Sequence, residues 1–402
     1  MKNFITRYWI LCLFATAAAG YLLGVARVGS TVWGDSIYYY SYTRSLVMDR
    51  NIDFSNESVE PSLPYPNPPV INSETNLVEN NFSPGTSLLW IPAFIFGQIV
   101  AGTLAWLGAP VLSNGYSLIT QIIVGLSAVG FGTLGVHFFA KGLRALFPQK
   151  TVIRTVISFL LATQLLYYLS LDPLNSHSVS FLLASLSFFI WVHIWQKRAS
   201  TWKQAIGLGA SLGMLALIRN QDVLTGVVLL GSLLFRVKPR VLLLQQISLT
   251  SLVAIGLGSI QLATNWTLFH SWQSPYILTG QALSWLHPDF IRVLFSSGNG
   301  FFRYAPFAAI SFFGLFSFAR VKKDVAIVCL LVFLCQLYVI ASWGPEIIGG
   351  PYGSRMFVGT LPFLGVGLAH LLTVAKQRLW LFGTAILFVW NLFQIGVMLV
   401  RW

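Results

Sequence analysis

Apolar stretches of roughly 20 residues recur along nearly the whole chain, and each is long enough to cross a ~30 Å hydrocarbon core as a helix. A membrane β-barrel would alternate apolar and polar residues, whereas these stretches are continuously apolar. Only 9% of the residues are charged, against about 25% in soluble domains. The sequence therefore predicts an all-α, polytopic membrane protein.

The net charge of +13 comes from 25 Lys and Arg against 12 Asp and Glu. In a soluble protein this excess would suggest nucleic acid binding. Here the basic residues lie in short loops between apolar stretches, where they orient membrane helices, so no nucleic acid partner is expected. The sequence has no P-loop and no H-E-x-x-H motif, which argues against an ATP-driven pump and a zinc protease. Its three cysteines have neither disulfide nor zinc-site spacing.

The first apolar stretch runs from Tyr8 to Val28 and is preceded by Lys2 and Arg7. Residues 17–20 resemble a signal-peptidase site, but apolar residues continue beyond them to Val28. We therefore expect an uncleaved span. Basic residues before a first span place the N-terminus in the cytoplasm.

The segment 29–114 is mostly polar and forms the predicted first outer loop. Its exception is an apolar stretch of 21 residues from Ser87 to Leu107. If this stretch crossed the membrane, 15 basic residues of later loops would move outside, against the positive-inside rule. We therefore expect a juxtamembrane or re-entrant helix over 87–107, bent at Pro92.

The resulting topology is one integral membrane domain over 1–402 with about 11 spans, a cytoplasmic N-terminus and an outer C-terminus. It places 17 of the 25 basic residues inside and 11 of the 12 acids outside, as expected for a multi-pass protein of the plasma (inner) membrane. A second long outer loop covers 265–304. The predicted spans are 8–28, 115–139, 152–170, 178–195, 204–218, 221–235, 241–264, 305–319, 324–343, 356–375 and 379–400.

The polar clusters that contain candidate catalytic or binding residues all fall on the predicted outer side. The first runs from Trp33 to Tyr40, directly after the first span, and contains Asp35 and Tyr38. Partial desolvation at the membrane boundary would raise the pKa of Asp35 and suit it to proton abstraction. The alternative is that Asp35 is the N-cap of a helix over 36–48.

The next two clusters lie in short outer loops. Asp172 and His177 can face one pocket or bind a metal or a phosphate, but Asp-Pro also opens ordinary solvated turns. Arg219 and Asp222 join two short apolar helices, where polar residues are costly unless they are paired or used. They can pair with each other, or Arg219 can contact a substrate.

The last two clusters are rich in glycine, which lets a backbone approach a ligand closely. Residues 297–304 include Arg303, and residues 343–355 include Glu346, Tyr352 and Arg355. Arg355 opens a predicted span, where it can meet an anionic lipid phosphate. The alternative for both arginines is anchoring among lipid headgroups.

The order and sidedness of these clusters resemble the C-type (GT-C) glycosyltransferases, in particular bacterial relatives of protein O-mannosyltransferases and lipid A aminoarabinose transferases. Trp33-Gly34-Asp35 with Tyr38 resembles the acidic motif that follows the family's first span. Residues 82–89 resemble its juxtamembrane segment, which lies outside without crossing. Residues 343–355, followed by Leu361-Pro362, are similar to a late Trp-Gly, Arg and Pro motif. The family usually has two adjacent acids after the first span, whereas this chain has only Asp35 there.

The resemblance implies sugar transfer from a polyprenyl-phosphate-linked donor to a hydroxyl of a glycan, lipid or protein acceptor, at the outer membrane face and with inversion. Asp35 would be the base, and Asp172 matches the position of the family's second outer-loop acid. The arginines would neutralise the phosphate leaving group. The expected substrate-binding residues are Tyr38, His177, Arg219, Arg303, Glu346, Tyr352 and Arg355.

No metal site and no cofactor are expected, although a divalent metal stays open. Two other function classes also stay open. A lipid or sugar transporter or flippase would place polar residues at midplane helix breaks on repeated halves, and the sequence shows neither. A non-catalytic assembly subunit is the third class.

Overall fold

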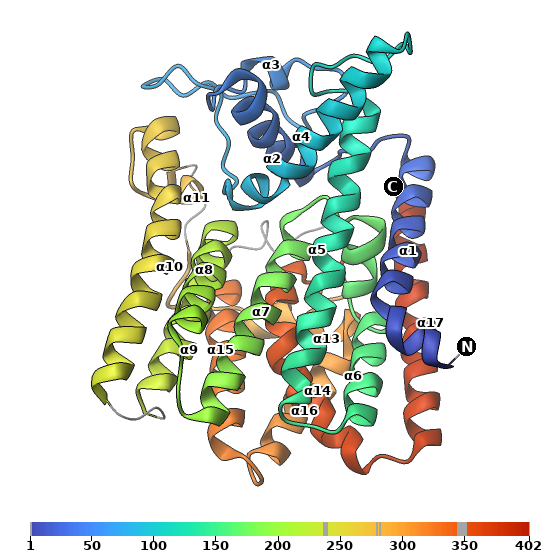
Figure 1. The fold of residues 1–402 in the computed structure, drawn as a ribbon, viewed down its shortest axis with the longest axis vertical. Coiled ribbons are helices and arrows are strands. Elements are labelled where there is room, and N and C mark those ends of the chain that lie inside the picture. The colour runs from blue at the N-terminus through green and yellow to red at the C-terminus, as the bar shows by residue number, and fades with distance from the viewer. Residues whose placement is uncertain (1, 236–239, 279, 281–282, 344–351, 402) are drawn as a thin grey trace. The chain divides into compact units, whose positions relative to one another are not determined.

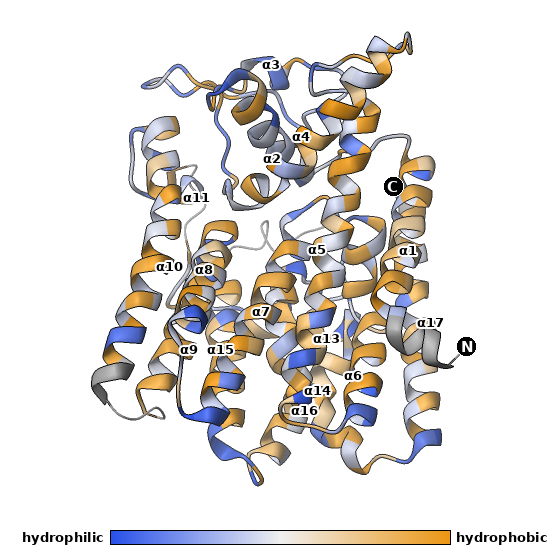
Figure 2. Ribbon diagram, viewed as in Figure 1, coloured by the Kyte–Doolittle hydropathy of each residue, from blue (hydrophilic) through white to orange (hydrophobic). Residues whose placement is uncertain are grey.

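The computed structural model describes residues 2–401 except 236–239, 279, 281–282 and 344–351. Within these residues the regular structure is helical, apart from one isolated antiparallel bridge between Ile71 and Val78 (Figure 1). Eight of the described helices are long and apolar enough to cross a membrane. In Figure 2 the long helices are mostly apolar, and polar residues gather towards helix ends and loops. The predicted all-α, polytopic membrane fold is thus confirmed.

Each predicted span coincides with a helix or with two helical pieces. The long helices are α1 (Lys2–Val28), α4 (Gly85–Trp106), α5 (Leu118–Arg144), α7 (Ser176–Lys197), α10 (Arg240–Phe269), α15 (Lys323–Ser342) and α17 (Gln377–Arg401). A 3₁₀ helix, η4 (Arg355–Thr360), and α16 (Leu361–Val374) together form the remaining long helical segment. The shorter apolar helices are α8 (Trp202–Ile218), α9 (Val223–Leu234) and α14 (Pro306–Phe318). The predicted span 152–170 consists of α6 (Gln149–Leu161) and a π-helical turn, η2 (Tyr167–Leu171). The number of crossings stays a prediction.

The chain forms two compact units, each assembled from segments far apart in sequence. Unit 1 comprises residues 1–133, 169–179 and 258–280, and unit 2 comprises 134–168, 180–257 and 281–402. Unit 1 contains the first predicted outer loop, and unit 2 contains most of the apolar helices that follow. The interpretation of the chain as one membrane domain stays a prediction.

In unit 1 the first predicted outer loop folds into α2 (Asp35–Arg44), a π-helical turn (Ser45–Asp49), α3 (Ser55–Ser58) and α4. The start of α4 is tied to α2, because Ser87 Oγ donates to the Tyr39 carbonyl at 2.7 Å and Thr43 Oγ1 donates to the Ser87 carbonyl at 3.1 Å. Figure 1 shows α2, α3 and α4 gathered in one cluster. This packing suits a surface helix, while the length of α4 also allows a crossing, so its membrane placement stays a prediction.

Arg44 holds this loop structure together from the end of α2. Its guanidinium pairs with Glu57 Oε1 at 3.0 Å and with Asp49, and its Nε donates to the Asn114 carbonyl at 3.3 Å. Arg44 is buried, and a buried charge is tolerated when it is paired and hydrogen-bonded. Burial nevertheless raises the pKa of Glu57, although the Arg44 contacts oppose that shift. The network fixes α2 against the rest of the loop.

Unit 2 is packed through small residues, as is common between membrane helices. A Cβ on Gly367 of α16 would overlap the Ser311 carbonyl oxygen of α14. A Cβ on Gly209 of α8 would lie only 2.5 Å from the Thr250 carbonyl oxygen of α10. These glycines therefore let the helix backbones touch.

The predicted topology can be tested with reporters fused at three positions. We expect fusions after Val111 and Asn175 to report the outer side and a fusion after Pro148 to report the inside, because the basic residues are distributed 17 to 8. Paired reporters, each active on only one side of the membrane, give the measurement. An inside signal after Val111 would make α4 a true span and reverse every later loop.

Candidate functional site

Asp35 is positioned by an unusual turn at the start of α2. Gly34 has φ 56° and ψ −132°, a conformation that residues with a Cβ rarely adopt. The Ser36 amide donates to the Trp33 carbonyl at 3.2 Å, which closes the turn. The N-cap is therefore Gly34, and Asp35 is the first helical residue. A carboxylate at this position interacts favourably with the positive end of the helix dipole. The sequence-based alternative that Asp35 is the N-cap is wrong.

Tyr38 lies one turn further along α2 and is half-buried. Its ring stacks on Phe82 at 4.7 Å and meets the edge of Tyr65 at 5.2 Å between ring centroids. Burial raises the pKa of Tyr38, and the negative charge of Asp35 raises it further. The phenol therefore stays protonated close to the Asp35 carboxylate, where it can donate a hydrogen bond to a substrate.

Asp172 lies in the connection between η2 and α7, and His177 lies in the first turn of α7. Both are buried, at 5% and 3% exposure. Asn175 folds this connection, because its amide donates to the Asp172 carbonyl while its Oδ1 accepts from the His177 amide at 2.7 Å. The alternative of a solvated turn is therefore wrong. A buried carboxylate and a buried imidazole close together in sequence are typical of a functional site, although structural hydrogen-bond networks also contain them.

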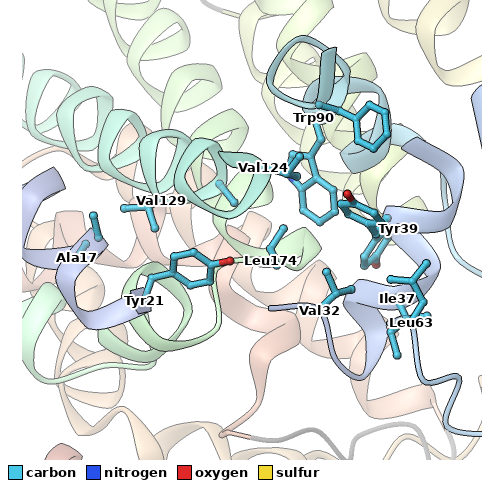
Figure 3. Close-up of a cluster of buried hydrophobic side chains, with 14 residues drawn as sticks. Ala17, Tyr21, Val32, Ile37, Tyr39, Leu63, Trp90, Val124, Val129 and Leu174 are labelled. Atoms are coloured by element: carbon cyan, nitrogen blue, oxygen red, sulfur yellow. The ribbon is translucent and has the colours of Figure 1, made fainter. Parts of the chain in front are cut away.

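One apolar cluster in unit 1 joins the segments that carry the two acids. Val32 and Ile37 flank Asp35, and Leu174 follows Asp172 by two residues. All three belong to the same group of buried residues, together with side chains from α1 and α5. Figure 3 shows Val32, Leu174 and Tyr21 within this cluster. The packing of unit 1 therefore supports both acid-bearing segments.

Unit 2 contains a buried carboxylate at the break between α8 and α9. Asp222 ends the 3₁₀ turn Asn220–Asp222, is 3% exposed, and accepts a hydrogen bond from Ser180 Oγ at 3.2 Å. The charge of Arg219 acts on this carboxylate, and the direct pairing of the two residues stays a prediction. A Cβ on Gly359 would come within 3.0 Å of Ser180 Oγ, which shows how tightly the 3₁₀ helix η4 (Arg355–Thr360) packs here.

The remaining predicted residues lie in or near the late motif of unit 2. Arg355 opens η4, which leads directly into α16. Arg303 is exposed on the short helix α13 (Phe301–Tyr304). Tyr352 is fully buried and donates its hydroxyl to Asn391 of α17, so here it supports the chain and offers no ring face to a sugar. Glu346 lies outside the described residues.

The predicted site residues therefore fall into two chemical sets. Unit 1 holds Asp35, Tyr38, Asp172 and His177, a set able to accept and donate protons. Unit 2 holds Tyr352 and the cationic set Arg219, Arg303 and Arg355. Among the described residues, no group of three or more His, Cys, Asp or Glu side chains could hold a metal ion.

Sequence reasoning missed two residues that the structure makes central. Asp222 was considered only as a partner of Arg219, and Asn391 was not considered. Both are buried polar residues in or next to apolar stretches of the sequence, and such residues in membrane helices are usually functional or tightly paired. That pattern was the available signal.

No protein-family model matches the chain, and no curated protein matches it in sequence. Solved structures do match. ArnT from Cupriavidus metallidurans, a lipid A aminoarabinose transferase, aligns in its complex with undecaprenyl phosphate with a TM-score of 0.58 and 12% identity. The alignment covers 94% of this chain and 63% of ArnT. The apo oligosaccharyltransferase from Archaeoglobus fulgidus aligns with a TM-score of 0.56 and 11% identity, over 98% of this chain and 56% of that chain.

The fold is that of a GT-C glycosyltransferase. This agreement confirms the resemblance inferred from the outer-side motifs. The chain spans less than two thirds of the length of either GT-C structure. A shared fold does not assign roles to individual residues.

Proposed function

We propose that this chain is a membrane glycosyltransferase that moves a sugar from a polyprenyl-phosphate-linked donor to an acceptor hydroxyl. The observation that carries the proposal is the fold, shared over 94% of this chain with ArnT bound to undecaprenyl phosphate. An oligosaccharyltransferase shares the same fold. None of these structures supports the transporter alternative. The acceptor is a glycan, lipid or protein at the outer face of the plasma membrane, and the N-terminus is cytoplasmic.

In the proposed reaction, Asp35 accepts the proton of the acceptor hydroxyl as its oxygen attacks the anomeric carbon of the donor. The bond from that carbon to the phosphate oxygen breaks, and the phosphate leaves with the electron pair. One displacement of this kind inverts the anomeric centre. The Gly34 turn supports this role, because it fixes the backbone at Asp35. Asp172 is the second candidate base, and its buried neighbour His177, like Tyr38, would contact substrate.

The cationic residues of unit 2 would stabilise the phosphate leaving group. Arginine suits this task because its planar guanidinium can donate two parallel hydrogen bonds to phosphate oxygens. Arg355 is the strongest candidate, since the backbone around it is fixed by several hydrogen bonds. Arg219 and Arg303 would contribute further positive charge, and Glu346 a polar contact. A divalent metal stays possible because the archaeal oligosaccharyltransferase has been seen with zinc, but no step above depends on one.

The reaction can be tested through the lipids of a deletion strain. We expect a polyprenyl-phosphate-linked sugar to accumulate when the gene is deleted, because its consumer is missing. Lipid extraction and mass spectrometry of the deletion strain and its parent give the measurement. The wild-type gene should restore the parental lipid pool and the Asp35→Asn variant should not. An unchanged pool of lipid-linked sugars in the deletion strain would contradict the proposed donor class.

A further inference from the structure

The backbone just before Arg355 is held at several points. Residues 352–354, which we name the strap, precede the 3₁₀ helix η4 that begins at Arg355. Tyr168 donates its hydroxyl to the Tyr352 carbonyl at 2.8 Å, and Gln164 Nε2 donates to the Ser354 carbonyl at 3.3 Å. Ser354 Oγ in turn donates to the Asn299 carbonyl at 2.6 Å. The strap is therefore anchored on both sides of Gly353.

The Tyr352 side chain is the largest of these anchors. Its ring is fully buried, stacks on Tyr167 at 5.0 Å and meets Tyr304 edge-on at 5.3 Å between centroids. Gly353 follows with φ 57°, and a Cβ there would lie 3.1 Å from Tyr304 Cβ. Ring packing and backbone conformation thus leave the strap little freedom.

Asn391 receives the Tyr352 hydroxyl from the middle of α17. Its Oδ1 accepts that hydroxyl, and its Nδ2 donates to the carbonyls of Leu161 at 2.8 Å and Thr163 at 3.0 Å. Leu161 is the last residue of α6, where carbonyls have no partner within the helix. Thr163 lies just beyond it, and its carbonyl also accepts from the Leu166 amide at 3.3 Å. Two carbonyls facing the amide nitrogen and one hydroxyl facing the amide oxygen use three of the four hydrogen-bonding positions of the Asn391 side chain. One amide therefore joins the last helix, the end of α6 and the strap.

The side-chain amide of Asn391 is not needed to pack α17 against its neighbours. Asn391 is fully buried, whereas Val389 and Phe393 on the same helix are 64% and 58% exposed. A buried polar group in a membrane helix is costly, and an apolar residue would fill the same space without needing three partners. The amide is therefore explained better by what it holds in place.

We infer that Asn391 and Tyr352 are positioning residues for Arg355, which they hold in place for the donor phosphate. This inference rests on the proposed function. Neither side chain needs to touch the donor, because the Tyr352 hydroxyl is directed to α17. The Arg355 amide donates to the Gly353 carbonyl at 2.9 Å, so the fixed strap passes directly into the arginine. A cationic group held in advance loses less entropy when it binds phosphate.

The test compares Tyr352→Phe in two backgrounds, with affinity for undecaprenyl phosphate as the readout. The variant removes only the hydroxyl and keeps the packed ring. We expect it to weaken binding roughly three- to ten-fold in the wild-type background, the range for one lost hydrogen bond. In an Arg355→Ala background the same change should alter binding less than about two-fold, because coupled residues are not additive.

Tyr338→Phe is the matched control in the same unit. Its hydroxyl also donates to a backbone carbonyl, that of Trp285 at 2.7 Å, and its loss should leave affinity unchanged. Equal effects of Tyr352→Phe in both backgrounds, or no effect in the wild type, would overturn the positioning role while Arg355 kept its own. An Arg355→Ala protein that binds as well as wild type would overturn both the phosphate role of Arg355 and the inference. No binding by the wild-type protein would count against the proposed function itself.

Discussion

Asp35→Asn is expected to abolish sugar transfer while leaving expression and stability in detergent close to wild type. Asparagine is nearly the same size as aspartate but cannot accept the acceptor proton. Loss of a general base typically lowers the rate by two to four orders of magnitude, about 3–5 kcal/mol in barrier height. Purified protein with a defined polyprenyl-phosphate-linked donor gives the turnover, and thermal unfolding in detergent gives the stability.

The structure makes this substitution a cleaner test than the sequence allowed. Gly34 occupies the N-cap position, so the change at Asp35 leaves the cap in place. The favourable interaction of the carboxylate with the helix dipole accounts for about 0.3–1 kcal/mol of the stability at risk. A large fall in turnover with a small fall in stability therefore separates chemistry from folding.

Asp289→Asn is the matched control for this prediction. Asp289 is an exposed acid that does cap a helix, since its Oδ1 accepts from the Arg292 amide at 3.0 Å at the start of α12 (Phe290–Phe295). Asparagine caps as well as aspartate, so turnover should stay at the wild-type level. If Asp35→Asn kept more than about a third of wild-type turnover, Asp35 would not be the base, and Asp172 would be tested next.

The sequence predicted the helices well, because the length of a continuous apolar stretch can be read from neighbouring residues alone. The stretch expected over 87–107 forms α4 at Gly85–Trp106, and the span expected over 178–195 forms α7 at Ser176–Lys197. The order of the outer-side motifs also led to the correct fold. The helix expected over 36–48 was placed within two residues, although its last turn is π-helical.

The contacts between distant segments could not be predicted in the same way. Asn391 lies in a mostly apolar stretch, and nothing near it in sequence reveals that its partners are Tyr352 and the end of α6. The resemblance implies that Tyr352 contacts substrate, but its burial is set by Tyr167 and Tyr304. The burial of Leu174, two residues after Asp172, likewise depends on a cluster that includes side chains of α1, α5 and α2. Pairing over such separations is decided by tertiary packing.

Arg355→Ala is expected to weaken donor binding more than Arg355→Lys, and both should lower transfer. Lysine keeps the charge but lacks the planar guanidinium that can hold two phosphate oxygens at once. Hydrogen bonds to charged groups are each worth about 1.5–3 kcal/mol, so alanine should weaken binding roughly 10- to 100-fold. Titration of the purified variants with undecaprenyl phosphate gives the affinities.

Arg292→Ala is the matched control, because Arg292 also lies on the predicted outer side of unit 2 but outside the late motif. If arginines at this level only anchored the protein among headgroups, both alanine variants would change the affinity for the donor lipid equally little. A loss confined to Arg355, with lysine intermediate, requires a specific phosphate contact. Unchanged affinity in both Arg355 variants would mean that Arg355 only anchors the protein among lipid headgroups. Arg219 and Arg303 would then be the candidates for binding the phosphate.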